Sequence, residues 1–477
     1  MKYDVLIAGA GVIGGMVARE LSKYKLTVCI LEKENDVAVG ASKANSGIIH
    51  GGYDPEPGTL KAKMNTRGVE LLYETAQMLH VPYRQNGSLV CAFGEEEEAG
   101  VRELYDRGRK NGIRGMRLLT GEEARKREPA LSEKVSLALY VPSAGIICPY
   151  KLTIAAIGNA MDNGVELKRN FEVTAIKREM GGFTVTSCNG ETVMGRYLIN
   201  CAGCGSDAIA QMAGDGGFEI IPRAGEYLLL DKSQGDRVSH TIFQVPTKEG
   251  KGVLVTPTVD GNLLTGPTAS VVDTPQNKET TPGGIKAVMA LAKKSVPGVD
   301  FSQVITSFAG VRSSEKNGDF IIEASGKVEG LIHVAAIDSP GLTSCVAIAE
   351  YVVDILKNSG VELETKRNWN GCREDTETFH HMNDEQKDAF IKEHPNYGKI
   401  VCRCETITEG EIRDAIRRNP PAMDMDGVKR RTRAGMGRCQ GGFCTPYVMR
   451  LIAEENDIPM EAVTKNGGVS RMVTGRM

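Results

Sequence analysis

The first thirty residues contain the pattern that most limits how this chain can fold. "YDVLIAGAGVIGGMVARELSKY" is an apolar run, a glycine-rich turn and an amphipathic stretch, which predicts a buried strand, a tight turn and a helix. Gly9, Gly11 and Gly14 form G-x-G-x-x-G. The first glycine allows the turn, the second lets backbone approach a pyrophosphate, and the third lets helix and strand pack closely. The pattern predicts a Rossmann-like α/β domain that binds a dinucleotide.

The acid after the next strand supports this prediction. "LTVCILE" reads as a second strand that ends on Glu32. A carboxylate there accepts hydrogen bonds from an adenosine ribose and disfavours a 2′-phosphate. An accidental glycine-rich turn is the alternative, but strand, turn, helix, strand and acid all occur in order. A second G-x-G-x-x-A at Gly203, Gly205 and Ala208 lacks a complete βαβ unit, so we expect one dinucleotide.

The sequence that follows resembles a known family. "GASKANSGIIHGGYDPEPGTLKAKM" is similar to flavin-dependent enzymes typified by D-amino acid oxidase, and most similar to L-2-hydroxyglutarate dehydrogenases and anaerobic-type glycerol-3-phosphate dehydrogenases. The resemblance continues through "AGIICPYKLTIAAI", "LINCAGCGSDAIA" and "SFAGVRSSEKNGDFII", to about residue 360. It implies that the dinucleotide is tightly bound FAD. The FAD-binding residues it implies are Gly9, Gly11, Gly14, Glu32, Lys33, Ala41, Ser42, Asn45, Ser46, Val173, Ala202, Gly203, Gly310, Gly341, Leu342 and Thr343.

The order of patterns predicts an interleaved enzyme. Short apolar runs separated by glycine and proline, such as "EYLLLD", "GVLVTP" and "NLLTGP", predict an antiparallel sheet that roofs the flavin. We expect an oxidoreductase over residues 1–365, a polar linker over 366–398, a small α-helical domain with four cysteines over 399–460 and a tail over 461–477. Within the oxidoreductase, the FAD-binding parts are about 1–80, 146–220 and 308–360, and the substrate parts are about 81–145 and 220–308.

Four cysteines near the C-terminus are paired as C-x-C and C-x4-C. Cys402 and Cys404 are followed, after a predicted helix and turn, by Cys439 and Cys444. Such a set suits a [2Fe–2S] cluster, while a four-cysteine zinc site is the alternative. The segment resembles the [2Fe–2S] domain of bacterioferritin-associated ferredoxin, which also occurs fused to some glycerol-3-phosphate dehydrogenases. The resemblance implies that the four cysteines hold the cluster, although the second pair is wider here than the ferredoxin's C-x2-C.

A basic run lies between the cysteine pairs. "KRRTRAGMGR" contains five cations and no acid. A nucleic-acid patch is one interpretation, but a tetrathiolate cluster is anionic and nearby cations stabilise it. A docking face for an acidic electron-transfer partner is a further interpretation. The formal net charge of −3 gives no reason to expect nucleic acid or an anionic membrane as a partner.

The chemistry implied by the resemblance needs a base and a cation. Oxidising a secondary alcohol requires a group that takes the hydroxyl proton. The resemblance implies that the loop containing His50 passes over the flavin, which makes His50 a candidate base. A structural histidine is the equal alternative. Arg312 in "AGVRSSEKNGD" matches an arginine at the substrate site of related flavoenzymes and suits phosphate or carboxylate. Lys316 is a second candidate cation, with a solvated lysine as the alternative.

These observations together predict a dehydrogenase with an electron exit. We expect it to oxidise a small anionic hydroxy substrate, foremost sn-glycerol 3-phosphate, and to pass electrons through the cluster to a partner protein. An L-2-hydroxyacid dehydrogenase and a non-catalytic electron-transfer subunit are the alternatives. No apolar run reaches the length of a membrane span, so the sequence predicts a cytoplasmic protein without excluding peripheral membrane association.

Overall fold

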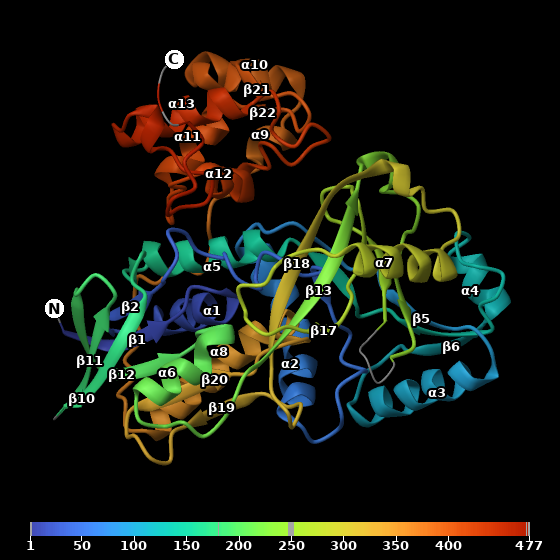
Figure 1. Cartoon of the computed structure of the whole chain (residues 1–477), viewed down its shortest axis with the longest axis horizontal. Coiled ribbons are helices and arrows are strands. Elements are labelled where there is room, and N and C mark those ends of the chain that lie inside the picture. The colour runs from blue at the N-terminus through green and yellow to red at the C-terminus, as the bar shows by residue number, and fades with distance from the viewer. Residues whose placement is uncertain (1, 180, 247–251, 474, 476–477) are drawn as a thin grey trace.

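The computed structural model describes residues 2–179, 181–246, 252–473 and 475 (Figure 1). An α/β part holds the N-terminus, a second part built on a large sheet lies beside it, and a small helical part formed by the C-terminal residues sits against both. Within the described residues, no helix is both long and apolar enough to cross a lipid bilayer.

The α/β part is built on an eight-stranded sheet whose centre is parallel. Strand β1 (Lys2–Ala8) lies between β12 (Thr192–Asn200) and β2 (Val28–Leu31), parallel to both. Its apolar residues are buried on both faces, as expected of a strand covered by helices. The sheet is completed by β9 (Glu166–Lys168), β10 (Val173–Glu179), β11 (Gly182–Ser187), β19 (Ile321–Ala324) and β20 (Leu331–Ala335).

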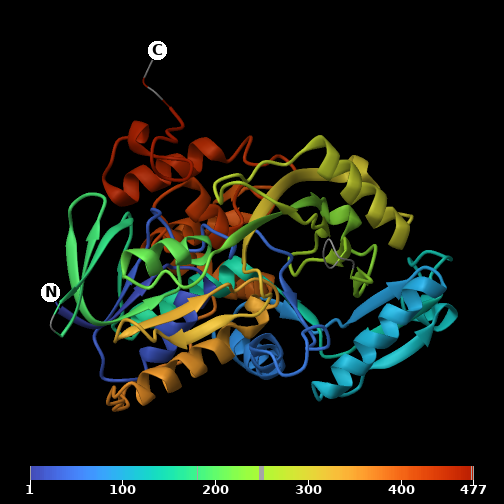
Figure 2. The same cartoon turned by 60° about the horizontal axis from the view of Figure 1, so that its bottom comes forward.

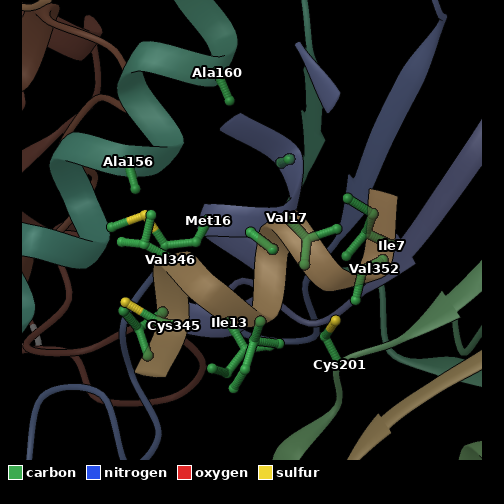
Figure 3. Close-up of a cluster of buried hydrophobic side chains, with 14 of the residues drawn as sticks. Ile7, Ile13, Met16, Val17, Ala156, Ala160, Cys201, Cys345, Val346 and Val352 are labelled. Atoms are coloured by element: carbon green, nitrogen blue, oxygen red, sulfur yellow. The ribbon is translucent and has the colours of Figure 1, made fainter. Parts of the chain in front are cut away.

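Helix α1 (Val12–Leu21) is the centre of the main core. All ten of its residues are buried, including the two charged residues of its last turn, Arg19 and Glu20. It packs against α5 (Pro149–Asp162) and α8 (Gly341–Asn358), and Figure 3 shows Met16 and Val17 of α1 among Ala156 of α5 and Val346 of α8. The remaining helices of this part are α2 (Leu60–Met78) and α6 (Ser206–Met212).

The second part is a nine-stranded, largely antiparallel sheet. Its longest strands, β13 (Ile221–Leu230) and β18 (Val304–Ser314), pair along nearly their whole length. The sheet therefore continues to residue 314, beyond the expected boundary near 308. The other strands are β5 (Ser88–Ala92), β6 (Arg117–Thr120), β7 (Leu137–Val141), β14 (Thr241–Gln244), β15 (Leu254–Pro257), β16 (Leu263–Gly266) and β17 (Ser270–Val271).

Three helices cover this sheet, and a small sheet connects it to the α/β part. Helix α3 carries four glutamates in its first turn and basic residues in its last, which complements the helix dipole. The helices are α3 (Glu95–Lys110), α4 (Gly121–Arg127) and α7 (Pro282–Ser295). The small sheet has the order β3 (Ile48–Ile49), β8 (Gly145–Ile147) and β4 (Tyr83–Arg84).

The C-terminal part has a separate apolar core. Helix α11 is the helix predicted between the two cysteine pairs, and it begins with a capping box between Thr408 and Glu411. Figure 2 shows this part on one side of the molecule, away from α3. Its elements are β21 (Ile400–Cys402), β22 (Ile407–Thr408), α11 (Glu409–Arg417), α12 (Met425–Thr432) and α13 (Thr445–Asn456).

The stretch expected as a linker has two different halves. Its first half follows the α/β part, where the Trp369 indole donates to Ser22 Oγ and Arg19 donates to the Gly371 carbonyl. Its second half forms α9 (Thr378–His381) and α10 (Asp384–Glu393). Aromatic rings from these helices cluster around Tyr397, whose hydroxyl donates to Asp414 of α11. Residues from about 378 onward thus pack with the C-terminal part.

Candidate active site and cluster-binding site

A cavity of about 1590 Å³ lies between the α/β part and the large sheet. The turn after β1, the loop over residues 39–46, the start of α8 and β18 all contribute to its lining. Most of the residues expected to bind FAD line it: Gly9, Gly11, Glu32, Lys33, Ala41, Ser42, Asn45, Ser46, Val173, Ala202, Gly203, Gly310, Gly341 and Leu342. Gly14 and Thr343 are not part of the cavity lining. Gly14 packs against the backbone of Gly9, and Thr343 accepts a hydrogen bond from the His50 amide.

The three motif glycines have different surroundings. A Cβ on Gly14 would lie 2.0 Å from the Gly9 carbonyl oxygen, so this position needs glycine for packing. Gly9 has φ +108°, and a Cβ there would lie 2.5 Å from the Cys201 carbonyl oxygen. A Cβ on Gly11 would meet only the Ser42 hydroxyl, at 3.2 Å, and would otherwise project into free space. The cavity therefore keeps room at Gly11 for a close ligand, which fits a dinucleotide pyrophosphate.

The carboxylate of Glu32 faces the cavity and also holds the glycine turn. Its Oε2 accepts from the Ala10 amide at 2.7 Å, and its Oε1 accepts from the Glu34 amide at 2.9 Å. Burial raises its pKa above the ordinary value, although the two amide hydrogen bonds oppose this. The sequence predicted a ribose-binding role alone, whereas the structure adds a backbone role, because both oxygens already accept protein hydrogen bonds.

His50 follows β3 and lines the same cavity. Its backbone amide donates to Thr343 Oγ1 at 2.8 Å, and its Nε2 lies 3.1 Å from Ser339 Oγ. Its carbonyl accepts from the Asn65 amide, and its ring lies 5.9 Å from the ring of Phe243. The ring is thereby oriented from the α8 side and from the large sheet, and one nitrogen is held by a hydroxyl.

Two arginines face the cavity from adjacent strands. Arg312 on β18 lies directly opposite Arg223 on β13, so both side chains share one face of the sheet. Both line the cavity, and neither forms an ion pair with any residue of the described chain. Two neighbouring guanidinium groups without a carboxylate partner form a receptor for an anion. Sequence reasoning missed Arg223, although it lies in the quoted "PRAGEYLLLD".

Two lysines differ from the sequence-based expectation. Lys316 is exposed and lies outside the cavity lining. Lys61 at the start of α2 lines the cavity and forms an ion pair with Asp338 at 2.5 Å. The structure thus brings His50 and Arg312 to one site and leaves Lys316 out. Lys61 carries no sequence signal of its own, because its partner lies far away in the chain.

The four C-terminal cysteines come together as two pairs. Cys404 Sγ lies 3.5 Å from Cys439 Sγ, and Cys402 hydrogen-bonds with Cys444. A [2Fe–2S] cluster takes two thiolates on each of two irons. Two separate pairs fit the cluster.

Backbone amides support the thiolate form of one cysteine in each pair, Cys402 and Cys439. In their partners the pKa is raised: the hydrogen bond with Cys402 and burial raise that of Cys444, and for Cys404 the backbone amide of Cys439 lowers the pKa but is outweighed by the Cys439 thiol and burial. The pKa of Cys402 is lowered to about 6: the hydrogen bond with Cys444 contributes most, the amides of Gly435 and Glu405 act in the same direction, and burial opposes them. For Cys439, burial raises the pKa, but the Cys404 thiol and the amides of the loop after it give a net decrease. Donors aimed at sulfur stabilise the thiolates that iron requires.

The basic run lies mainly in the interface between the C-terminal part and the rest of the molecule. Arg430 and Arg431 both bind the carboxylate of Asp36, which is fully buried, and the Arg431 contact is 2.8 Å. Arg433 binds Asp260 at 2.7 Å and Glu405 at 2.8 Å. The suggestion that this run is an exposed docking face is therefore wrong for these three arginines. Their charges neutralise acids of the neighbouring parts.

Burial of Asp36 is compensated by these arginines. Burial alone would raise its pKa, but the guanidinium groups of Arg431 and Arg430 hold the pKa well below its usual range. Asp36 lies in the loop whose neighbours Lys33, Glu34 and Val39 line the cavity. The C-terminal part is thus attached to the loop that forms one end of the dinucleotide site.

Comparison with known proteins agrees with this geometry. Residues 4–355 match the family described as FAD dependent oxidoreductase, and residues 400–454 match the BFD-like [2Fe-2S] binding domain. The chain belongs to the FAD-dependent oxidoreductase family and carries a C-terminal [2Fe–2S] domain; its cofactors are FAD and a [2Fe–2S] cluster. The fold class and both cofactors predicted from the sequence are confirmed.

Particular relatives share different lengths of the chain. A glycerol 3-phosphate dehydrogenase of Caloramator mitchellensis is 45% identical over 473 residues, which is 99% of this chain and 98% of the relative. The FAD-bound structure of L-alpha-glycerophosphate oxidase from Mycoplasma pneumoniae is 34% identical, has a TM-score of 0.75, and covers 78% of this chain and 98% of its own. Human mitochondrial L-2-hydroxyglutarate dehydrogenase is 29% identical over 410 residues, 74% of this chain and 88% of the relative.

Proposed function

We propose that this protein is an FAD-dependent dehydrogenase that oxidises sn-glycerol 3-phosphate to dihydroxyacetone phosphate and passes the electrons through its [2Fe–2S] cluster to a partner acceptor. The observation that carries the anion preference is the cross-strand pair Arg223 and Arg312 on the cavity wall. The full-length similarity to a glycerol 3-phosphate dehydrogenase, C-terminal domain included, supports the particular substrate.

Arg312 and Arg223 bind the phosphate group in this proposal. A guanidinium can donate two parallel hydrogen bonds to phosphate, and two of them match a dianion better than one lysine would. Lys61 stands at the same cavity, but its charge is already balanced by Asp338. We therefore assign phosphate binding to the two arginines and leave Lys61 as a positioning residue for Asp338.

His50 takes the proton of the substrate hydroxyl in this proposal. Its Nε2 lies 3.1 Å from Ser339 Oγ, and in this proposal the substrate hydroxyl takes the place of that serine hydroxyl. Neutral imidazole accepts a proton near neutral pH. FAD, when bound, supplies the acceptor for the hydride of the carbinol carbon. Its binding residues are the cavity-lining glycines, Glu32 and the loop over residues 39–46.

The C-terminal cysteines provide the path by which electrons leave the flavin. Cys402, Cys404, Cys439 and Cys444 hold the cluster in this proposal, and α9 and α10 belong with residues 399–460 because their rings pack on Tyr397. An enzyme that gave its electrons directly to oxygen would need no such centre. The proposal therefore predicts a dehydrogenase, with a protein as the acceptor.

The test is the anaerobic reduction of the bound flavin by candidate substrates, which is monitored through the loss of flavin absorbance. sn-Glycerol 3-phosphate should bleach the flavin, and L-2-hydroxyglutarate and other 2-hydroxyacids should do so far more slowly. Preferential bleaching by L-2-hydroxyglutarate would show that the substrate assignment is wrong, while the assignment as a dehydrogenase would stand. A flavin that no hydroxy substrate bleaches, but dithionite does, would favour a non-catalytic electron-transfer subunit.

His50→Ala is the matched test of the base. The variant should retain FAD and show strongly slowed bleaching, by roughly 10²–10⁴-fold, the usual contribution of general base catalysis. Its pH profile should lose the limb that the wild-type protein shows near the histidine pKa. Unchanged bleaching kinetics and pH profile would give His50 a structural role.

A further inference from the structure

Two large aromatic side chains are exposed beside the cluster cysteines. Phe443 lies in the loop between Cys439 and Cys444, and its exposed fraction is 83%. Tyr447 lies on the first turn of α13, with an exposed fraction of 50%. Single exposed apolar residues are common on protein surfaces. A proposal from this pair therefore needs further observations on the same surface.

Arginines supply most of the charge around the two rings. Arg403, between Cys402 and Cys404, is exposed and forms no ion pair with another described residue. Arg438, next to Cys439, is 67% exposed, although it also contacts Asp231. The guanidinium of Arg450 lies 5.5 Å from the centre of the Tyr447 ring, and its Nε also contacts Glu454 at 3.5 Å. No aspartate or glutamate occurs between residues 433 and 453, and Glu454 follows directly.

The acid that lies within the cysteine loops is not available to a partner. The Glu405 side chain is 4% exposed and binds Arg433 and Lys232. Because the Cys404 and Cys439 sulfurs lie 3.5 Å apart, the residues next to them are held around one point of the surface. We call this surface the cluster face and define it as Arg403, Arg438, Phe443, Tyr447 and Arg450.

We propose that the cluster face is the docking surface for an acidic protein that carries one electron at a time. Arginine and aromatic residues are enriched at protein interfaces. Electron-transfer complexes form through small interfaces, which a surface of this size can supply. Positive charges around the face attract an acidic partner and orient it. In the transfer, the reduced cluster loses one electron and the carrier gains it; no bond or proton changes place. The proposal rests on the proposed function for the source of that electron.

The observations favour a protein over a membrane as the occupant. The apolar part of the face is two side chains on a loop and one helical turn, whereas interfacial helices bury a long apolar face. The cysteine pair Cys404 and Cys439 also lies at this surface, where the first is exposed and the second half-buried. Electron transfer requires close approach to the cluster, and the cluster face is where a protein carrier can come closest.

The experiment uses the holoprotein and a plant-type ferredoxin, an acidic one-electron carrier, as the probe. Binding is measured by titration calorimetry with both proteins oxidised, at two salt concentrations. In stopped flow, reduced ferredoxin is then mixed with oxidised holoprotein, and the second-order rate of cluster reduction is followed. Variants are Phe443→Ala and the double charge reversal Arg403→Glu with Arg450→Glu. The control is Arg102→Glu on α3, an exposed arginine far from the cluster face.

The charge reversal should weaken binding and slow the second-order rate by on the order of tenfold to a hundredfold. Added salt should also weaken binding and slow the rate in the wild type, because it screens the attraction between the charges. Phe443→Ala should weaken binding at both salt concentrations, and Arg102→Glu should change neither quantity. Dithionite should reduce the cluster equally in all variants. Equal ferredoxin binding and rates in all variants would overturn the proposal.

Two further readouts separate the other occupants and the proposed function. Loss of a dimer in the Phe443→Ala variant, or binding of the cluster face to anionic phospholipid vesicles, would assign the face to a second copy or a membrane and overturn the proposal. The ferredoxin reaction uses no substrate. A holoprotein that fails to bleach with sn-glycerol 3-phosphate, but shows the predicted ferredoxin results, would therefore refute the proposed function and support the docking surface.

Discussion

The dinucleotide site and the C-terminal domain are held in the molecule by different forces. Around the glycine turn, close backbone packing decides the structure: α1 is buried on all sides, and a Cβ on Gly14 would collide with the Gly9 carbonyl. The C-terminal domain is attached through ion pairs such as Asp36 with Arg431. A closely packed region is destabilised by a change in side-chain volume but not by a change in pH. A buried ion pair is destabilised by the loss of one charge and depends less on side-chain volume. The two regions should therefore fail under different changes.

The largest effect is expected from Gly14→Val. A Cβ at this position would lie 2.0 Å from backbone that cannot move without displacing the turn, so the α/β domain should not form its FAD site. The purified protein should contain no FAD and lack cooperative thermal unfolding of this domain. Gly11→Val is the matched variant: it should fold, because its surroundings are open, yet lose FAD. Retention of FAD by either variant would contradict the assignment of this turn.

The next effect is expected from Asp36→Ala. The change leaves Arg430 and Arg431 without their buried partner, which costs about 3–5 kcal/mol. Hydrogen exchange of α11, α12 and α13 should accelerate strongly, while β1 and α1 remain protected. Glu350→Ala, which removes a partly exposed ion pair with Arg67, is the control and should cost less than about 1 kcal/mol. Equal exchange in both variants would mean that packing, not charge, holds the C-terminal domain.

A smaller effect is expected from Arg312→Lys compared with Lys316→Ala. Arg312 lines the cavity, and losing its forked hydrogen bonds should raise the KM for sn-glycerol 3-phosphate roughly tenfold, as for a charge-assisted hydrogen bond worth about 1.5–3 kcal/mol. Lys316 is exposed outside the cavity, so its removal should change KM less than about twofold. The comparison is made by steady-state kinetics with FAD content measured in parallel. A larger rise in KM for Lys316→Ala than for Arg312→Lys would mean that the anion binds near Lys316 and not at Arg312.

The smallest effect is a pH dependence confined to the C-terminal domain. The hydrogen bond that His380 Nε2 donates to the Glu411 carboxylate raises the pKa of His380, although burial opposes it. Because the folded pKa is raised, this contact stabilises the fold fully below the ordinary histidine pKa of about 6.5 and is lost as the pH rises through the folded value. Hydrogen exchange of α9 and α10, corrected for its intrinsic pH dependence, should show more opening at pH 9 than at pH 6. His380→Gln should abolish that difference, and α1 should show none in either protein.

The sequence predicted the features that depend on neighbouring residues. The strand, turn and helix around Gly9 and Gly14, the helix after Cys404 and the two cysteine pairs all follow from local spacing. The cavity residues on the loop over 39–46 followed from resemblance. The assignments of these residues to FAD and cluster binding remain proposals, while the family and the cofactors are confirmed.

Features that depend on distant contacts could not be predicted. Asp36 and Arg431 are separated by 395 positions, so the basic run looked exposed although its arginines are neutralised across a domain interface. Arg223 became a candidate only when the β13–β18 register placed it opposite Arg312. Lys61 and Asp338 meet because α2 begins beside α8 in space, which no periodicity reveals. In each case the partner is set by topology.

The central claim is that electrons from the substrate reach a cluster held by the four cysteines. The most direct measurement is electron paramagnetic resonance of anaerobic holoprotein, frozen after mixing with sn-glycerol 3-phosphate, in the wild type and in Cys404→Ser. The account predicts two irons and two sulfides per chain, a reduced [2Fe–2S] signal that appears with substrate in the wild type, and flavin bleaching without that signal in the variant. Stoichiometric zinc without sulfide, or an oxidised cluster that stays silent while the flavin bleaches, would contradict it.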